Sequence, residues 1–341
     1  LRAFAAASCL TLAIASAGSA NAAPEKPLTA VEPVAVTAKP IPFEDGKPVG
    51  NRFGKLQWLG TLELSSQSPY FGGYSGIAVS ADGSEFIAVS DIGHWLRGRI
   101  VSEAGRLAGV AELRQGPLLD AAGKPLVDKS SSDAEGITSA VPGQIEGDTY
   151  ISFERKHRIA AVTVGKDGPG PATRLVVTPQ ELTKASPNEG LEAVTVMRAG
   201  ADKGLVLAFT ERLLDGNGDH VGWMLGEAEP RRLLLKRLDD FDVTDAAALP
   251  DGGAVFLERC FPCPILSQMR LRRVSAAEIA STGPMSGETL LLAGQVFEID
   301  NMEGLAVHVD DQGRVILTVI SDDNFNRRFQ RTLLMRFRID E

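Results

Sequence analysis

The sequence repeats a short phrase five times, and this repeat constrains the fold more than any other feature. Each copy is a small or acidic residue followed by Gly or Ala and then by an apolar run. The copies begin at Ser75, Glu135, Glu189, Asp245 and Glu303, at intervals of 60, 54, 56 and 58 residues. Repeats of this length that contain several short strands are typical of a β-propeller.

About four strands fit into each repeat. In the second repeat they span residues 136–141, 149–153, 158–164 and 173–177, with Pro, Gly and Asp at the turns between them. The last repeat holds only three strands, and residues 56–64 offer the missing one. Such an exchange leaves no terminal sheet edge exposed. We therefore predict one all-β propeller of five four-stranded blades, closed by an N-terminal strand that completes the last blade. A sixth, degenerate blade is the alternative.

The remaining parts of the chain are assigned from composition. Residues 1–22 contain a basic Arg2, an apolar run and a small-residue cleavage site ending at Ala22, which predicts a cleaved signal peptide and export to the periplasm or the medium. Residues 23–52 hold six prolines and are predicted to be a disordered linker. Residues 53–341 are predicted to form the propeller domain.

Charge and cysteine content limit the classes of partner. The chain has 44 acidic and 35 basic residues without a basic patch, which argues against nucleic acid. No segment after residue 22 reaches 18 apolar residues, so no membrane span is expected. We expect a monomer that binds a small anionic or ester substrate. Cys260 and Cys263 follow an apolar run rather than opening a helix, which favours a local disulfide over a redox pair.

A second set of acids follows the repeated phrases. Each phrase is followed, 13 to 22 residues later, by an acid at the end of an apolar run. If each phrase begins the innermost strand of a blade, antiparallel pairing brings both acids to the same mouth of the central channel. One ring would then contain Glu135, Glu189, Asp245 and Glu303, and the other would contain Asp91, Glu154, Glu211, Glu258 and Asp322, with Asp323 as a further candidate.

So many carboxylates at one mouth require a counter-charge. Two unit charges of the same sign about 4 Å apart repel by about 4 kcal/mol at an effective dielectric constant of about 20. Arg155, Arg212 and Arg259 each follow a second-ring acid directly. One interpretation is a structural ring of ion pairs between blades. The other is that the acids hold Ca²⁺ while the arginines bind an anionic substrate.

Two weaker signals accompany the rings. Residues 215–219 alternate oxygen donors as a calcium loop does, but they lack the later ligands of an EF-hand, which favours a polar hairpin turn. His94 and His157 lie just past second-ring acids, and either is a candidate general acid or base or a hydrogen-bonded structural residue.

The motifs together resemble a known family. They are Phe71-Gly72-Gly73-Tyr74-Ser75-Gly76, Asp133-Ala134-Glu135-Gly136, Phe153-Glu154-Arg155-Lys156-His157, Asn188-Glu189-Gly190-Leu191-Glu192-Ala193, Leu257-Glu258-Arg259 and Ser321-Asp322-Asp323-Asn324. In order and spacing they are similar to the phytase-like propeller family of exported bacterial proteins, described by the phrase "esterase-like activity of phytase". The resemblance runs from about residue 53 to the end of the chain.

The resemblance implies a metal-dependent hydrolase of phosphoester or ester bonds, with Ca²⁺ as the expected metal. Carried over residue by residue, the implied positions are Asp91, Glu135, Glu154, Glu189, Glu258, Glu303, Asp322 and Asp323. The chain departs from the acidic pattern at Ser75 and at Asp245-Ala246.

Three functions remain open from the sequence. In a hydrolase, a carboxylate or His157 would act as the base, and Arg155, Arg212 or Arg259 would stabilise negative charge. In a binding protein, the same mouth would capture a ligand without turnover. In a lactonase-like hydrolase, one axial calcium would take an Asn ligand, for which Asn188 and Asn301 are placed.

Overall fold

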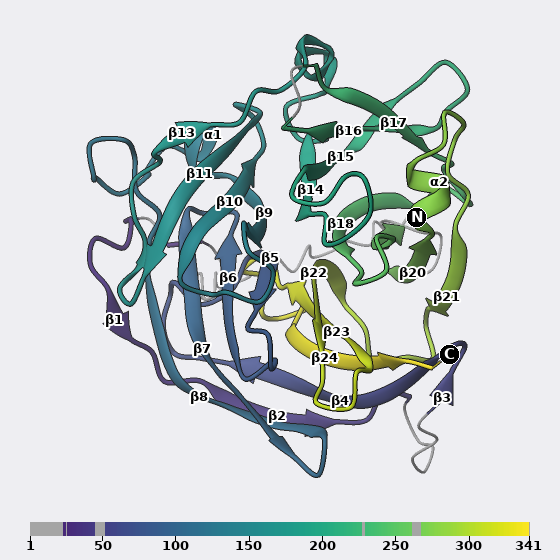
Figure 1. Ribbon diagram of the computed structural model, residues 1–341. Coiled ribbons are helices and arrows are strands. Elements are labelled where there is room, and N and C mark those ends of the chain that lie inside the picture. Colours follow the sequence, from purple (N-terminus) through teal and green to yellow (C-terminus); the bar gives the residue numbers. More distant parts are fainter. Residues whose placement is uncertain (1–22, 25, 45–51, 227–228, 261–266, 341) are drawn as a thin grey trace, which may run out of the picture.

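Five antiparallel sheets surround a common axis as the blades of a propeller (Figure 1). The computed structural model describes residues 23–24, 26–44, 52–226, 229–260 and 267–340. The five-bladed architecture predicted from the repeat is confirmed. The predicted signal peptide at residues 1–22 lies outside the described part of the chain.

Each blade is built from consecutive strands, numbered from the axis outward. Blade 1 comprises β5 (Tyr74–Val79), β6 (Glu85–Ser90), β7 (His94–Glu103) and β8 (Arg106–Pro117). Blade 2 comprises β9 (Ala134–Ser139), β10 (Gly147–Phe153), β11 (Arg158–Gly165), β12 (Gly168–Pro169) and β13 (Arg174–Leu175). Blade 3 comprises β14 (Leu191–Val196), β15 (Val206–Leu214), β16 (His220–Leu225) and β17 (Arg231–Leu235). Blade 4 comprises β18 (Asp242–Ala248), β19 (Ala254–Cys260), β20 (Gln268–Val274) and β21 (Glu288–Ala293).

Blade 5 joins the two ends of the domain. Its strands are β22 (Asn301–Val309), β23 (Val315–Asp322), β24 (Thr332–Ile339) and, from the N-terminal side, β4 (Leu56–Ser65). β4 pairs with β24 along its length, so the predicted closing strand is confirmed. Helices are short: α1 (Lys129–Ser132), the 3₁₀ turn η1 (Gln180–Lys184) and α2 (Ala276–Ile279).

Part of the predicted linker is packed rather than disordered. β1 (Glu32–Pro33) pairs with β8, and β2 (Thr37–Ile41) pairs with β4, so this segment runs along the outside of blades 1 and 5 (Figure 1). The short strand β3 (Arg52–Phe53) also pairs with β4. Leu28, Val34 and Phe43 are buried. The prediction of a disordered linker is wrong for these residues because prolines do not prevent a segment from packing as an edge strand.

The innermost strands crowd around the axis, and this explains the glycines of the repeated phrase. A Cβ atom on Gly76 would lie 2.8 Å from the carbonyl oxygen of Glu135 in the next blade. A Cβ atom on Gly136 would lie 2.7 Å from the carbonyl oxygen of Glu192. Real Cβ atoms do not approach backbone so closely, so neighbouring blades meet where these residues lack side chains.

The channel between the innermost strands is nearly filled. The space lined by β5, β9, β14, β18 and β22 has a volume of about 30 Å³. At this level the guanidinium of Arg198 donates a hydrogen bond to the carbonyl oxygen of Val307 at 2.6 Å. A small-molecule site usually has about 300 Å³ or more. The axial space is therefore too small to admit a small molecule to the acidic residues.

Candidate functional site

Every blade carries a β-bulge at the repeated phrase. In blade 2, Ala134 pairs with Phe153 and Gly136 pairs with Ser152, so Glu135 is an extra, unpaired residue. The equivalent extra residues of blades 1, 3, 4 and 5 are Ser75, Glu192, Thr244 and Glu303. A bulge re-aims the side chain of its extra residue. The five bulges therefore set the first ring at the channel mouth.

The bulge corrects the predicted ring member of blade 3. The extra residue there is Glu192, which is buried, whereas Glu189 precedes the strand. Glu189 accepts a hydrogen bond from Arg212 at 3.0 Å, with about a third of its side chain exposed. The sequence pattern favoured Glu189 because Glu189-Gly190 matches the repeated phrase better than Glu192-Ala193 does.

The bulge also moves Asp245 out of the first ring. Thr244 is the extra residue of blade 4, and Asp245 takes the following position, which is glycine in three other blades. The buried Asp245 carboxylate accepts hydrogen bonds from the backbone N–H of Ala246 at 2.8 Å and of Leu305 at 2.7 Å. Burial raises its pKa well above the usual range, against the opposing effect of these bonds. Asp245 thus ties blade 4 to blade 5.

The second ring follows the same register in four blades. In each of these blades, one residue of the second strand pairs with the residue just before the bulge of the first strand. The acid is the next residue along the second strand: Asp91, Glu154, Glu211 or Asp322. In blade 4 this position belongs to Arg259, because Val243 pairs with Glu258. Successive residues of a strand point to opposite faces, so a shift of one residue exchanges the two side chains.

Glu258 consequently forms a pair inside blade 4 instead of joining the mouth. Its carboxylate bonds to Arg272 and lies 3.7 Å from Arg270, both on the neighbouring strand β20. All three side chains are buried. Burial raises the pKa of Glu258 to about 7, although the two arginines favour its charged form. The structure therefore places this predicted metal ligand in a structural ion pair.

Arg259 occupies the mouth and bridges three blades. Its guanidinium bonds to Glu303 and Asn301 of blade 5, and donates to Glu211 of blade 3 at 3.2 Å. Among the described residues, Arg259 is the one cation at a second-ring position, where the other four blades have an acid. Two acids that would otherwise repel each other, Glu211 and Glu303, are held by this one group.

The other two predicted arginines are also engaged. Arg155 donates to the buried carboxylate of Asp133, just before β9. Arg212 bonds to Glu189 and, through its Nε atom, to Asp242 of blade 4 at 2.9 Å. The structural interpretation of the arginines is thus supported for all three, and a role in substrate binding would use their remaining N–H groups.

The carboxylates of blades 2 and 3 form a continuous group, here called the acidic arc. It consists of Asp133, Glu135, Glu154, Glu192 and Glu211, all of them buried. Carboxylate oxygens of Asp133, Glu135 and Glu154 lie within 4.8 Å of one another, as do those of Glu154, Glu192 and Glu211. Glu154 belongs to both triplets and so lies at the centre of the arc.

Three acids of the arc have no ion pair to a cation within the described part of the chain: Glu135, Glu154 and Glu192. Burial raises the pKa of Glu135 and of Glu192 well above the usual range, and the surrounding carboxylates add to both shifts. Burial likewise raises the pKa of Glu154 to about 7, although the backbone N–H of Gly190 donates to it at 2.7 Å. The cations at the arc therefore pair with its outer members, Asp133 and Glu211, and not with these three acids.

The remaining mouth acids lie in blades 5 and 1. Asp91 bonds to Lys129 at 2.9 Å, and Lys129 also bonds to Asp133. Asp322 accepts from the backbone N–H of Asn324 at 2.6 Å, and burial beside Glu303 raises its pKa well above the usual range. Asp323 accepts from the N–H groups of Gly73 and Phe325, which gives it a role in the loop.

Both candidate histidines contact backbone rather than the arc. The His157 ring packs so closely on Gly190 that a Cβ atom there would lie 1.9 Å from it, and burial lowers the pKa of His157. His94 accepts a hydrogen bond from the N–H of Leu28 at 3.2 Å. The residues 215–219 form a hairpin turn in which Asp215 accepts from Asn217 and Asp219. Cys260 is disulfide-bonded, and its predicted partner Cys263 lies outside the described residues.

Sequence reasoning missed two members of the arc, Glu192 and Asp133. The phrase Glu192-Ala193-Val194 has the pattern of Asp245-Ala246-Ala247, and this similarity was the available signal. Asp133 lies two residues before the lead Glu135, and nothing in the repeat marks that position.

Comparison with known proteins identifies the family. The family described as "Phytase-like: Esterase-like activity of phytase" matches residues 69–325, which is most of the chain. The chain belongs to this phytase-like family. No match was found among curated proteins.

Two solved structures are similar to this phytase-like protein. One is a putative 6-phosphogluconolactonase from Bacteroides uniformis, with 13% identity, 87% of this chain and 79% of that chain covered, and a TM-score of 0.36. The other is a PQQ-bound aldose sugar dehydrogenase from Streptomyces coelicolor, with 10% identity, 89% and 99% covered, and a TM-score of 0.42. No helix among the described residues is long and apolar enough to cross a bilayer.

Proposed function

We propose that this phytase-like protein is an exported hydrolase of phosphoester or carboxyl-ester bonds, and that its acidic arc binds Ca²⁺. The observation that carries the proposal is the group of three buried acids, Glu135, Glu154 and Glu192, without a described counter-ion. Buried carboxylates are normally paired or bound to a metal. Family membership supports the hydrolytic class.

The donors of the arc fit a hard cation. Calcium takes six to eight oxygen ligands, including carboxylates that bind through one or both oxygens. The two triplets offer carboxylate oxygens from β9 and the end of β10 in blade 2 and from β14 and β15 in blade 3, and Glu154 would belong to both sets of ligands. A divalent ion would remove the repulsion that raises the pKa values of Glu135 and Glu192.

The surrounding residues can contribute to hydrolysis. Bound Ca²⁺ would supply positive charge to polarise the scissile ester or phosphoryl oxygen. Arg259 projects a fixed guanidinium between Glu211 and Glu303 and would hold an anionic group of the substrate. Arg155 of blade 2 and Arg212 of blade 3 would be further anion contacts.

Glu154 is the better placed of the two proposed bases. Its carboxylate lies at the centre of the arc, and nearby Ca²⁺ would lower its pKa from about 7, so that it would be ionised and able to accept a proton from an attacking water near neutral pH. His157 lies against Gly190, and its Nδ1 atom is buried without a hydrogen-bond partner among the described groups. In the proposed step, water attacks the ester or phosphoryl centre and Glu154 takes a proton from it. The bond to the leaving oxygen then breaks, and Glu154 returns the proton to that oxygen as the alcohol leaves.

A second candidate function is calcium-stabilised ligand binding without turnover. The observation in its favour is that Arg155, Arg212 and Arg259 are all engaged in ion pairs. An arginine held by carboxylates can position a ligand, but it has less charge to offer to a transition state.

The test is hydrolysis by the mature, chelator-treated protein with and without added Ca²⁺. Phosphomonoester, phosphodiester, carboxyl-ester and lactone substrates cover the classes under consideration. Calcium-dependent turnover that is lost in Glu154→Gln and kept in Glu189→Gln supports the hydrolase. Calcium binding without turnover on any of the four substrates rejects catalysis and favours the binding protein. Export is tested separately, by the mass of the protein recovered outside the cytoplasm, which should lack residues 1–22.

A further inference from the structure

A second pocket lies on the face of the propeller away from the acidic arc. It is formed where the β18–β19 and β22–β23 turns meet the end of β24, and its volume is about 650 Å³. In these antiparallel blades the turns are at the opposite strand ends from Arg259 and Asp322. We propose that this pocket, here called the inter-blade pocket, binds a small organic anion: a carboxylate or phosphate monoester with an apolar body.

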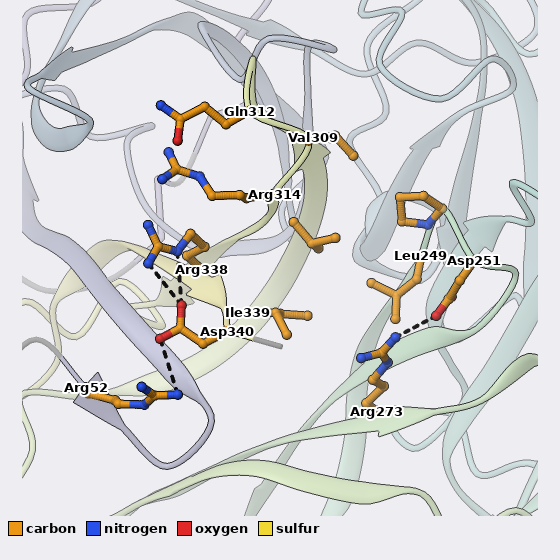
Figure 2. Close-up of a pocket in the computed structure, with 13 residues that line it drawn as sticks. Arg52, Leu249, Asp251, Arg273, Val309, Gln312, Arg314, Arg338, Ile339 and Asp340 are labelled. Carbon is orange, nitrogen blue, oxygen red and sulfur yellow. Dashed lines mark hydrogen bonds and ion pairs between the residues drawn. The ribbon is translucent and has the colours of Figure 1, made fainter.

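Arginines line both walls of the inter-blade pocket. Arg314 and Arg338 lie on the blade 5 side, Arg52 belongs to β3, and Arg273 belongs to blade 4 on the other side (Figure 2). The acids nearby are Asp251 and Asp340 in the lining, Asp310 beside Arg314, and Asp311 in the same turn. Four arginines stand against four aspartates, so these charges balance, in a chain whose net charge is −9. The pocket is therefore less negative than the chain as a whole, which favours anions there.

The guanidinium groups are already held in place. Arg273 bonds to Asp251 at 2.6 Å, Arg338 bonds to Asp340 at 3.1 Å, and Arg314 bonds to Asp310 at 2.7 Å. Figure 2 shows the first two of these pairs, on opposite walls of the pocket. Each guanidinium has five N–H donors, so a carboxylate at one edge leaves donors for a ligand at another. Fixing the side chain beforehand lowers the entropy cost of binding.

Apolar side chains lie between the charged groups. Leu249 belongs to the blade 4 wall, and Val309 and Ile339 belong to blade 5 (Figure 2). A bare inorganic anion would leave these surfaces in contact with water, whereas a neutral hydrocarbon would take water from the arginines without replacing its hydrogen bonds. A molecule with an anionic head and a short apolar chain satisfies both parts of the pocket, whose volume is in the usual range for small ligands.

The proposal is tested by calorimetric titration of the full chain with octanoate and octyl phosphate. Octanamide controls for the charge, and inorganic phosphate controls for the apolar chain. We expect saturable binding of the two amphiphilic anions, weakened about tenfold by Arg314→Gln and by Arg273→Gln through loss of a charge-assisted hydrogen bond. Arg232→Gln is the matched control, because Arg232 has the same side-chain exposure as Arg314, 40%, and also pairs with an acid.

The outcomes separate this site from the acidic arc. Binding that persists in the Glu135→Gln/Glu192→Gln protein supports a distinct pocket, and binding lost there places the anion at the mouth and overturns the proposal. Absence of saturable binding also overturns it, as does equal binding of octanamide, which would show only an apolar cleft. Unchanged affinity in both arginine variants rejects these residues as the anion site. Thermal melts of each variant exclude misfolding as the cause of a loss.

Discussion

Buried acids have bonding partners in blade 4 that the central acids of the acidic arc do not have among the described cations. In blade 4, Glu258 is paired with Arg272 and Asp245 is bonded by two backbone N–H groups. In the arc, Glu135 and Glu192 form no ion pair with a described cation. A protein can neutralise a buried carboxylate with its own side chains or leave that task to an external ion. The comparison therefore separates acids paired within the fold from the acids that we propose bind calcium.

The largest expected effect comes from breaking the pair in blade 4. Arg272→Met leaves the fully buried Glu258 without its main partner and should lower the free energy of unfolding by about 3 to 5 kcal/mol. Chemical denaturation measures this loss. The added substitution Glu258→Leu should restore much of it, since no unpaired charge remains. A loss below about 1 kcal/mol would show that the pair is not a structural element.

The pH dependence of stability should have an unusual sign because of Glu154. Its pKa is raised to about 7 in the folded protein, so the folded state binds the proton more tightly than the unfolded state between pH 4.5 and 7. Its contribution to stability is full below pH 4.5 and is lost as the pH rises through 7.

Denaturation of chelator-treated protein at pH 5 and pH 8 measures this contribution. Compared with Glu154→Gln, the wild-type protein should lose on the order of 2 kcal/mol more stability from pH 5 to pH 8. The variant serves as reference because other acids titrate in the same range. A wild-type protein that gains stability relative to the variant would contradict the absence of a counter-charge.

Neutralising an acid of the arc should have the opposite effect from breaking the pair in blade 4. In chelator-treated protein at pH 8, Glu192→Gln removes repulsion among buried carboxylates and should raise the free energy of unfolding by about 1 kcal/mol. The same substitution should reduce the stabilisation by added Ca²⁺. Destabilisation of the chelated variant would mean that Glu192 already has a partner.

The smallest effect is expected at Glu189, the acid first assigned to this ring. Glu189 and Arg212 are each more than a third exposed, and such surface pairs contribute little. Glu189→Gln should change the unfolding free energy by less than about 0.5 kcal/mol and leave calcium stabilisation intact. A loss of calcium stabilisation equal to that of Glu192→Gln would return Glu189 to the site.

The repeat interval predicted the fold correctly because blade number and strand order depend on pattern alone. The site depends on single-residue register, and the pattern cannot resolve that. Glu192 rather than Glu189 joins the first ring because Glu192 is the bulged residue of blade 3. Arg259 rather than Glu258 joins the second ring because the strand register of blade 4 is shifted by one residue. The packed segment containing β1 and β2 was missed because these strands are short, largely exposed and contain prolines, which an edge strand tolerates, so they carry no apolar alternation to detect.

The central claim is that the acidic arc binds calcium through acids that form no ion pair with a described cation. Calorimetric titration of chelator-treated protein with CaCl₂ tests it most directly, with the Glu135→Gln/Glu192→Gln protein and Glu189→Gln titrated in parallel. We predict saturable binding by the wild-type protein and by Glu189→Gln, and its loss in the double variant. Absence of binding by the wild-type protein, or equal binding by the double variant, would contradict the account.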